Sequence, residues 1–154
     1  MTTYALMLFI HILASTLWVG GMFTMHFAVR PAAVALLPPP QRLPLMTAAL
    51  GRFFDWVVAA VFAVLGSGLA MMFGARTFSA LHPSVHLMFA LGVAMIAIFA
   101  VIRLLAYRRL RAAVAVEQWP AAAKQLDAIR KLVAVNLVLG IVTIAVATLG
   151  RALF

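Results

Sequence analysis

The sequence predicts an all-α membrane protein, a bundle of four transmembrane helices with cytoplasmic helical extensions. Apolar residues make up 67% of the 154-residue chain and charged residues only 10%, and the mean hydropathy of +1.15 is well above that of a soluble domain. Four stretches are also apolar over about the 20 residues that a helix needs to cross a bilayer. We therefore expect a single lipid-embedded domain over residues 1–154, without internal repeats.

The first apolar stretch covers residues 4–28 and is expected to be a permanent helix. No Lys or Arg precedes it, and it is longer than the apolar core of a typical signal peptide. Pro31 and the three consecutive prolines at 38–40 interrupt the chain after it. Because proline is tolerated in the first turn of a helix, residues 41–50 are expected to form a short interfacial helix before the second span.

The other three spans are expected at residues 53–74, 85–107 and 132–149. The connection 75–84, between the second and third spans, is short and contains Pro83. The connection before the last span is longer and highly charged, and Trp119-Pro120 is expected to begin a helix within it. Two helical extensions that project into water should therefore meet near this point.

Basic residues predict how the helices are oriented. Twelve Lys and Arg against three acids give a formal net charge of +9, but they lie between apolar stretches, so we expect anionic lipid and no nucleic acid as their partner. The first and third connections hold Arg30, Arg42, Arg52, Arg108, Arg109, Arg111, Lys124, Arg130 and Lys131, whereas the second connection has Arg76 and the C-terminus Arg151. The positive-inside rule then predicts a bacterial inner-membrane protein with both termini in the periplasm.

Polar and sulfur-containing side chains form a stripe along the first predicted helix. They recur at steps of three or four residues, which places them on one face: Met7, His11, Ser15, Trp18, Met22 and His26. The ordinary interpretation is a packing face on which His11 only hydrogen-bonds a neighbouring helix. A histidine about 10 Å along the helix from its membrane end is nevertheless costly to leave unpaired. The stripe therefore also indicates a functional site.

A second pair of histidines, His82 and His86, opens the third helix. That helix runs parallel to the first, so His11 and His86 are expected in the same half of the bundle, while His82 is expected at the interface. Two neutral imidazoles suit the axial positions of a heme b, and they also suit a copper ion. The chain has no cysteine, so the alternative copper site would draw its further ligands from Met7, Met22, Met25, His26, Met71, Met72 and Met88.

The expected cytoplasmic half carries its own polar side chains: His26, Arg30, Asp55, Arg103 and Asn136. Asp55 is the only acid in or next to a span, and we interpret it as the partner of a nearby arginine in a buried ion pair that fixes helix register. If a tetrapyrrole is bound, the arginines would instead meet its propionates. Asn136 begins a stripe of small residues that predicts a close-packing surface, namely Gly140, Thr143 and Ala147.

The polar stripe also carries a resemblance to a known family. The segment His11-(six residues)-Trp18-Val19-Gly20-Gly21-Met22-Phe23, followed by Arg30-Pro31, resembles the first helix of the copper resistance protein D (CopD) family. Ile129-Arg130-Lys131-Leu132 with Asn136 resembles the fourth helix of its small stand-alone members. The resemblance covers nearly the whole chain and implies a four-helix membrane protein.

The same opening is similar to the HemJ type of protoporphyrinogen oxidase, a four-helix membrane family that binds heme b. This resemblance implies that His11 is an axial ligand, that His86 is its partner on the third helix, and that Trp18 packs against the macrocycle. The Leu-Pro-Arg of the HemJ type is absent, with Thr24-Met25-His26 in its region, and Leu137 rather than an acid follows Asn136. The resemblance therefore does not extend to the oxidation of porphyrinogen.

Three hypotheses about function follow. The first is a heme-b-binding protein, redox or oxidase-like, with the heme between the first and third helices. The second is CopD-like transport or handling of copper through His and Met sites. The third is a structural subunit of a membrane complex. The partners expected are the bilayer, a second copy of the chain, and a quinone or a periplasmic redox or copper protein, and no catalytic residue is predicted.

Overall fold

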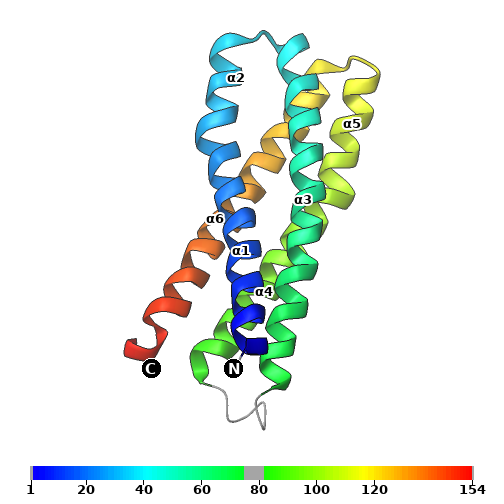
Figure 1. The fold of residues 1–154 in the computed structure, drawn as a ribbon. Coiled ribbons are helices and arrows are strands. Elements are labelled where there is room, and N and C mark those ends of the chain that lie inside the picture. The colour runs from blue at the N-terminus through cyan, green and yellow to red at the C-terminus, as the bar shows by residue number, and fades with distance from the viewer. Residues whose placement is uncertain (1, 75–81, 154) are drawn as a thin grey trace.

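The computed structural model describes residues 2–74 and 82–153, and this part of the chain is helical almost throughout and contains no strand. Four helical rods run side by side and alternate in direction (Figure 1). All four are long and apolar enough to cross a membrane: Thr3–Leu36, Pro39–Phe73, Pro83–Ala115 and Trp119–Gly150. The predicted fold class is confirmed. Arg76 and most of the predicted connection 75–84 lie outside the described residues, as does the side chain of Arg151.

The first rod contains a wide turn. It consists of α1 (Thr2–Thr24), the π-helical segment η1 (Met25–Val29) and α2 (Arg30–Leu36). At the turn, the N–H of Arg30 donates to the carbonyl of Met25, five residues earlier. The cause is Pro31, which has no N–H and whose ring would clash with the carbonyl four residues earlier in a regular α-helix. His26 consequently lies on an irregular turn.

The second rod is a single helix, α3 (Pro39–Phe73). The prediction of a separate interfacial helix at 41–50 is therefore wrong, because these residues form the first turns of α3 itself. Pro44 lies inside the helix, but the N–H that it lacks would have bonded only to Pro40 in the first turn. The helix thus loses one hydrogen bond near its end and continues.

The third rod comprises α4 (Pro83–Val101), the π-helical η3 (Ile102–Ala106) and α5 (Tyr107–Ala115). Glu117, with a φ of 54°, then turns the chain into the fourth rod, α6 (Trp119–Leu153). α6 begins at the Trp119-Pro120 pair that the sequence singled out. α1 packs mainly against α3 and α4 mainly against α6, so the bundle is built from two antiparallel pairs.

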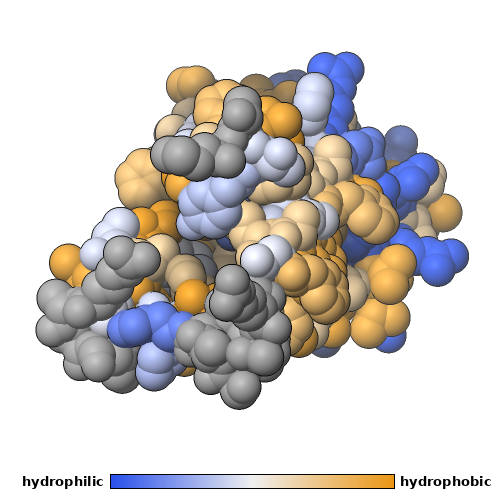
Figure 2. All heavy atoms as spheres, turned by 60° about the horizontal axis from the view of Figure 1, so that its bottom comes forward, coloured by the Kyte–Doolittle hydropathy of each residue, from blue (hydrophilic) through white to orange (hydrophobic). Residues whose placement is uncertain are grey.

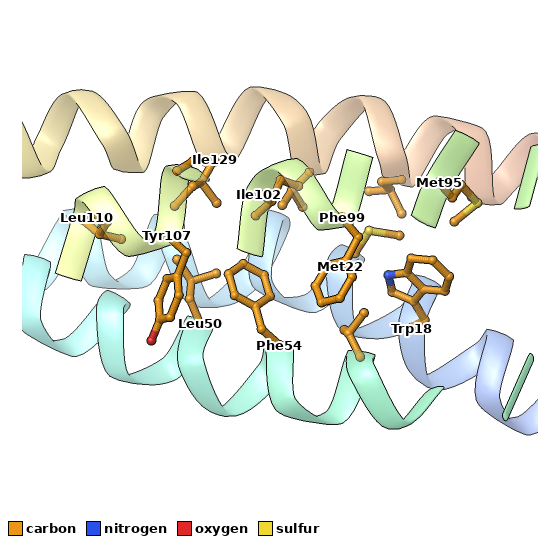
Figure 3. Close-up of a cluster of buried hydrophobic side chains, with 14 of the residues drawn as sticks. Trp18, Met22, Leu50, Phe54, Met95, Phe99, Ile102, Tyr107, Leu110 and Ile129 are labelled. Carbon is orange, nitrogen blue, oxygen red and sulfur yellow. The ribbon is translucent and has the colours of Figure 1, made fainter. Parts of the chain in front are cut away.

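Four aromatic rings form a column through the middle of the bundle (Figure 3). Trp18 lies 6.1 Å from Phe99, Phe99 5.7 Å from Phe54, and Phe54 5.2 Å from Tyr107, measured between ring centroids, and each pair meets edge to face. The Tyr107 hydroxyl donates to the carbonyl of Thr47 at 3.1 Å. Gly51 permits this approach, because a Cβ there would lie 2.3 Å from the hydroxyl oxygen. This aromatic column ties α1, α3 and the third rod together.

Buried apolar side chains are distributed unevenly along the bundle. We call residues 3–13, 61–74, 82–94 and 141–150 the terminal half, because both chain ends lie there (Figure 1), and the opposite half, with most Lys and Arg, the basic half. The apolar core lies in the middle and in the basic half. In the terminal half, the buried residues are the small Ser67, Ser84 and Gly150. Close contact between small residues, rather than interlocking large side chains, therefore holds this half together.

The outside of the bundle is apolar. Large exposed side chains include Phe9, Phe27, Trp56, Phe62 and Phe73. Figure 2 turns the terminal end toward the viewer and shows apolar side chains over much of this face, with most of the strongly hydrophilic ones toward its right edge and a smaller group at its lower left. In water such a surface would aggregate, whereas in a bilayer it faces lipid.

Candidate metal centre

His11 lies in the seam between α1 and α3. Its Nδ1 is 3.1 Å from the carbonyl oxygen of Val64 and 3.1 Å from the hydroxyl of Ser67. A carbonyl only accepts hydrogen bonds, and the Ser67 hydroxyl donates its own proton to the carbonyl of Ala63 at 2.5 Å. His11 Nδ1 must therefore carry a proton, which leaves Nε2 as the lone-pair nitrogen of the neutral ring. A backbone carbonyl that fixes the tautomer in this way is typical of metal-ligating histidines.

Small residues on α3 make room for this ring. Ser67 is 4% exposed, and a Cβ on Gly68 would lie 3.2 Å from His11 Cε1. On α1, the Ser15 hydroxyl donates to the carbonyl of His11 at 2.7 Å. The ring is thus held between two helices, and its orientation is fixed from the α3 side.

Helix register predicts methionines in the next layer of the same seam. Met7 lies one turn before His11 on α1, and Met71 lies one turn after Ser67 on α3. The two helices are antiparallel and His11 pairs with Ser67, so one turn of about 5.4 Å in the same direction is expected to put Met7 and Met71 at the same level. Both methionines are half-buried, as is Met72. The register of the two helices therefore predicts thioether sulfurs one layer from the imidazole nitrogen of His11.

The other predicted ligands of the terminal half lie on α4. His86 and Met88 are half-buried there. His82 caps the helix, because its Nδ1 lies 2.8 Å from the Ser84 hydroxyl and accepts from the Ser84 N–H at 3.4 Å. Ser84 in turn is buried against Gly150. A Cβ added to Gly150 would lie 2.6 Å from the Cβ of Ser84, so only glycine permits this contact. The capping role of His82 was missed in the sequence, although a residue directly before Pro83 is where a helix cap is expected.

His11 and His86 share one half of the bundle but belong to different helix pairs, since α1 packs on α3 and α4 on α6. Their joint ligation of one group stays a prediction. Among the described residues, no three His, Cys, Asp or Glu side chains gather closely enough to hold a metal ion. A metal in this half would accordingly need methionine as well as histidine.

The remaining predicted site residues lie in the middle or in the basic half. Trp18 and Met22 are buried in the core at 4% and 2% exposure, and Met25 is half-buried. His26 Nδ1 and Asn136 Oδ1 are buried without a hydrogen-bond partner in the described part of the chain. The structure thus separates His26, Met22 and Met25 from the His11 seam along the length of α1.

Asp55 forms its predicted ion pair with Arg103, at 2.9 Å, and the Arg103 guanidinium lies 5.3 Å from the centre of the Tyr107 ring. The pair is not buried as the sequence suggested, because the side chain of Asp55 is 69% exposed on the outside of the bundle. It links α3 to η3 on the surface.

We expect Asp55→Asn to lower the free energy of unfolding in detergent by about 1 kcal/mol or less, because water screens an exposed pair. A double-mutant cycle with Arg103→Gln measures this coupling. A loss of several kcal/mol would contradict the exposed geometry.

Comparison with known proteins identifies one family. The family model for copper resistance protein D (CopD) matches residues 47–149, about two thirds of the chain. The match begins within α3 and ends within α6, so it includes Met71, His82 and His86, and His11 lies before it. No curated protein and no solved structure matches the chain.

Proposed function

The chain belongs to the copper resistance protein D family, and from this premise we propose that it handles copper in the membrane, binding Cu(I) as its cargo in the terminal half of the bundle. The observation that carries the proposal is the α1–α3 seam. There, the backbone carbonyl of Val64 holds the His11 ring with Nε2 as the lone-pair nitrogen, and helix register predicts Met7 and Met71 in the next layer.

The chemistry of these ligands favours Cu(I). Thioether sulfur is a soft ligand that selects monovalent copper, and imidazole binds it as well. Harder ions such as Mg²⁺ or Ca²⁺ prefer carboxylate and carbonyl oxygen. The seam offers His11, Met7 and Met71 and no carboxylate, since the three acids of the chain are Asp55, Glu117 and Asp127.

The packing of the middle of the bundle favours binding and exchange at one end over an open passage. Trp18, Phe54 and Phe99 meet edge to face across the interior, and all three are less than 10% exposed. Beyond them lie several arginines, whose charge would repel a copper ion. We infer that a single chain accepts and releases copper from the side of the membrane that holds its termini.

Heme b held by His11 and His86 is the second candidate function, as the similarity to the HemJ type implies. The observation that favours it is the thin packing of the terminal half, where the buried residues are Ser67, Ser84 and Gly150. A bulky planar group between α1 and α4 would fill such a region next to Trp18. The same neutral His11 Nε2 suits iron and copper alike.

One experiment distinguishes the two candidates. Protein purified in detergent from cells supplied with both copper and a heme precursor is analysed for metals and by absorption spectroscopy. We expect about one copper per chain after reconstitution with Cu(I) under reducing conditions, and no visible bands. Stoichiometric iron with the split bands of a six-coordinate b-type cytochrome, and no retained copper, would replace the copper proposal with the heme one.

The proposed orientation places the site at the periplasm. Because most Lys and Arg lie at the opposite end, we expect both termini outside the cytoplasm. Alkaline phosphatase fused after Phe154 should be active, and a fluorescent reporter that folds only in the cytoplasm should stay dark. The reverse pattern would put the copper site on the cytoplasmic side.

A further inference from the structure

Arginines from three helices converge at the edge of the basic half. Arg30 begins α2, Arg42 lies in the first turns of α3, and Arg130 lies in α6. The charges of Arg42, Asp127 and Arg130 all act on the Arg30 guanidinium. Arg30, Arg42 and Asp127 line a cavity of about 210 Å³, and Arg30 and Arg130 line an adjoining one of about 30 Å³. We call these adjoining spaces the arginine cavity.

Positive charge exceeds negative charge in the arginine cavity. Asp127 is the carboxylate that lines it, and this group is already shared by two neighbours on its own helix. It accepts from Arg130 Nη2 at 2.6 Å and from Lys131 Nζ at 2.9 Å. Two more guanidinium groups, those of Arg30 and Arg42, face the same space. Like charges held together in partly buried positions repel one another, and an anion bound between them would relieve this repulsion.

The rest of the wall is apolar. Val34, Leu43 and Leu126 line the larger space from the same three helices, and Met25, Leu50 and Val133 line the smaller one. His26 is the further polar residue that lines the smaller space, and its buried Nδ1 has no partner among the described residues. A ligand that fits this wall has an anionic end for the arginines and an apolar part for the remaining surface.

The size and position of the cavity further restrict the chemical class of the ligand. Sites for drug-sized molecules usually measure about 300–1,000 Å³, so the larger space suits a head group rather than a complete organic ligand. It also lies near the end of apolar spans, at the level where lipid phosphates meet a bundle of this length. We propose that the arginine cavity binds the phosphate of an anionic phospholipid, with Arg30 and Arg42 as its main contacts.

This proposal is independent of copper binding and can be tested separately. Detergent-purified protein is titrated with phosphatidylglycerol, phosphatidylcholine or inorganic phosphate, while bound lipid is counted by native mass spectrometry and thermal unfolding is followed. We expect phosphatidylglycerol to bind and to raise Tm, and Arg42→Gln to weaken its binding by roughly tenfold or more, because charge-assisted bonds to phosphate are the strong class.

Arg109→Gln is the matched control, because it removes the same charge from an exposed position on α5. Arg109→Gln should leave phosphatidylglycerol binding unchanged. Arg42→Lys keeps the positive charge and should retain part of the binding, which distinguishes the effect of lost charge from a failure to fold. Equal losses in Arg42→Gln and Arg109→Gln would show general surface attraction and overturn the site. Equal stabilisation by inorganic phosphate, with the same dependence on Arg42, would overturn the lipid as its ligand.

Discussion

Replacing His11 by alanine is expected to weaken Cu(I) binding by at least about 100-fold. Loss of an outer-sphere partner alone typically costs 10–100-fold in metal affinity, and His11 supplies the nitrogen ligand itself. Met7→Leu and Met71→Leu should each weaken binding by roughly tenfold or more, since leucine keeps the volume but removes the sulfur. Competition with a chromophoric Cu(I) chelator under reducing conditions measures all three affinities.

The two matched controls lie on the same rod. His26→Ala removes an imidazole and Met25→Leu removes a thioether, but both side chains are on η1, which follows Trp18 along the rod, whereas His11 precedes it. Both variants, His26→Ala and Met25→Leu, should bind Cu(I) with the affinity of the unmodified protein. If His26→Ala weakens binding as much as His11→Ala does, copper binds along a ladder through the bundle rather than at one site in the terminal half.

The contacts of His11 in the seam also predict how substitutions of its neighbours affect copper binding. Gly68→Val would place carbon atoms where the His11 ring lies, because even a Cβ there stands 3.2 Å from Cε1. Ser67→Ala would leave the Val64 carbonyl as acceptor of the Nδ1 proton. We therefore expect Gly68→Val to impair copper binding and Ser67→Ala to change it little. The same chelator competition measures both.

The architecture was predictable because its signals are local. An apolar run of about 20 residues identifies a span without knowledge of its neighbours, and the breaks occur where the sequence places Pro38, Pro83 and Trp119-Pro120. The continuity of α3 through Pro44 was not predictable from these rules, since a proline near a helix start can either begin a new helix or cost one hydrogen bond. The wide turn before Pro31 has the same origin.

The neighbours of each site residue were less predictable. Helical periodicity places Met7, His11 and Trp18 on one face, but it does not say which helix that face meets. The structure sets His11 against Ser67 on α3, and Trp18 against Phe99 on α4. Likewise, Asp55 had several arginines within reach of its helix end, and only helix pairing selects Arg103.

The arginine cavity illustrates the same limit over longer separations. In the sequence, Arg30, Arg42 and Arg130 are separate positive charges that orient the helices and are expected to meet anionic lipid, and nothing indicates that they share one cavity. Their convergence depends on the turn between α2 and α3 and on the docking of α6 against α3 and η1. Such a site can be recognised only when the relative positions of three rods are known.

Phe54→Ala is expected to be the most destabilising single substitution that we consider, with a loss of about 3 kcal/mol in the free energy of unfolding. Phe54 is 1% exposed and meets Phe99 and Tyr107 edge to face in the aromatic column (Figure 3). Phe→Ala costs about 3–5 kcal/mol in soluble cores. The lower end applies here, because lipid is as apolar as the core and the loss is mainly that of packing.

Phe62→Ala is the matched control on the same helix. Phe62 is 72% exposed and faces lipid, so its removal leaves no cavity and should change stability by about 0.5 kcal/mol or less. Reversible unfolding in mixed detergent micelles measures both variants, and Phe54→Leu should recover part of the loss because it refills most of the volume. If Phe54→Ala and Phe62→Ala unfold alike, the aromatic column does not hold the rods together, and the middle of the bundle is then loose enough to admit a passage for copper.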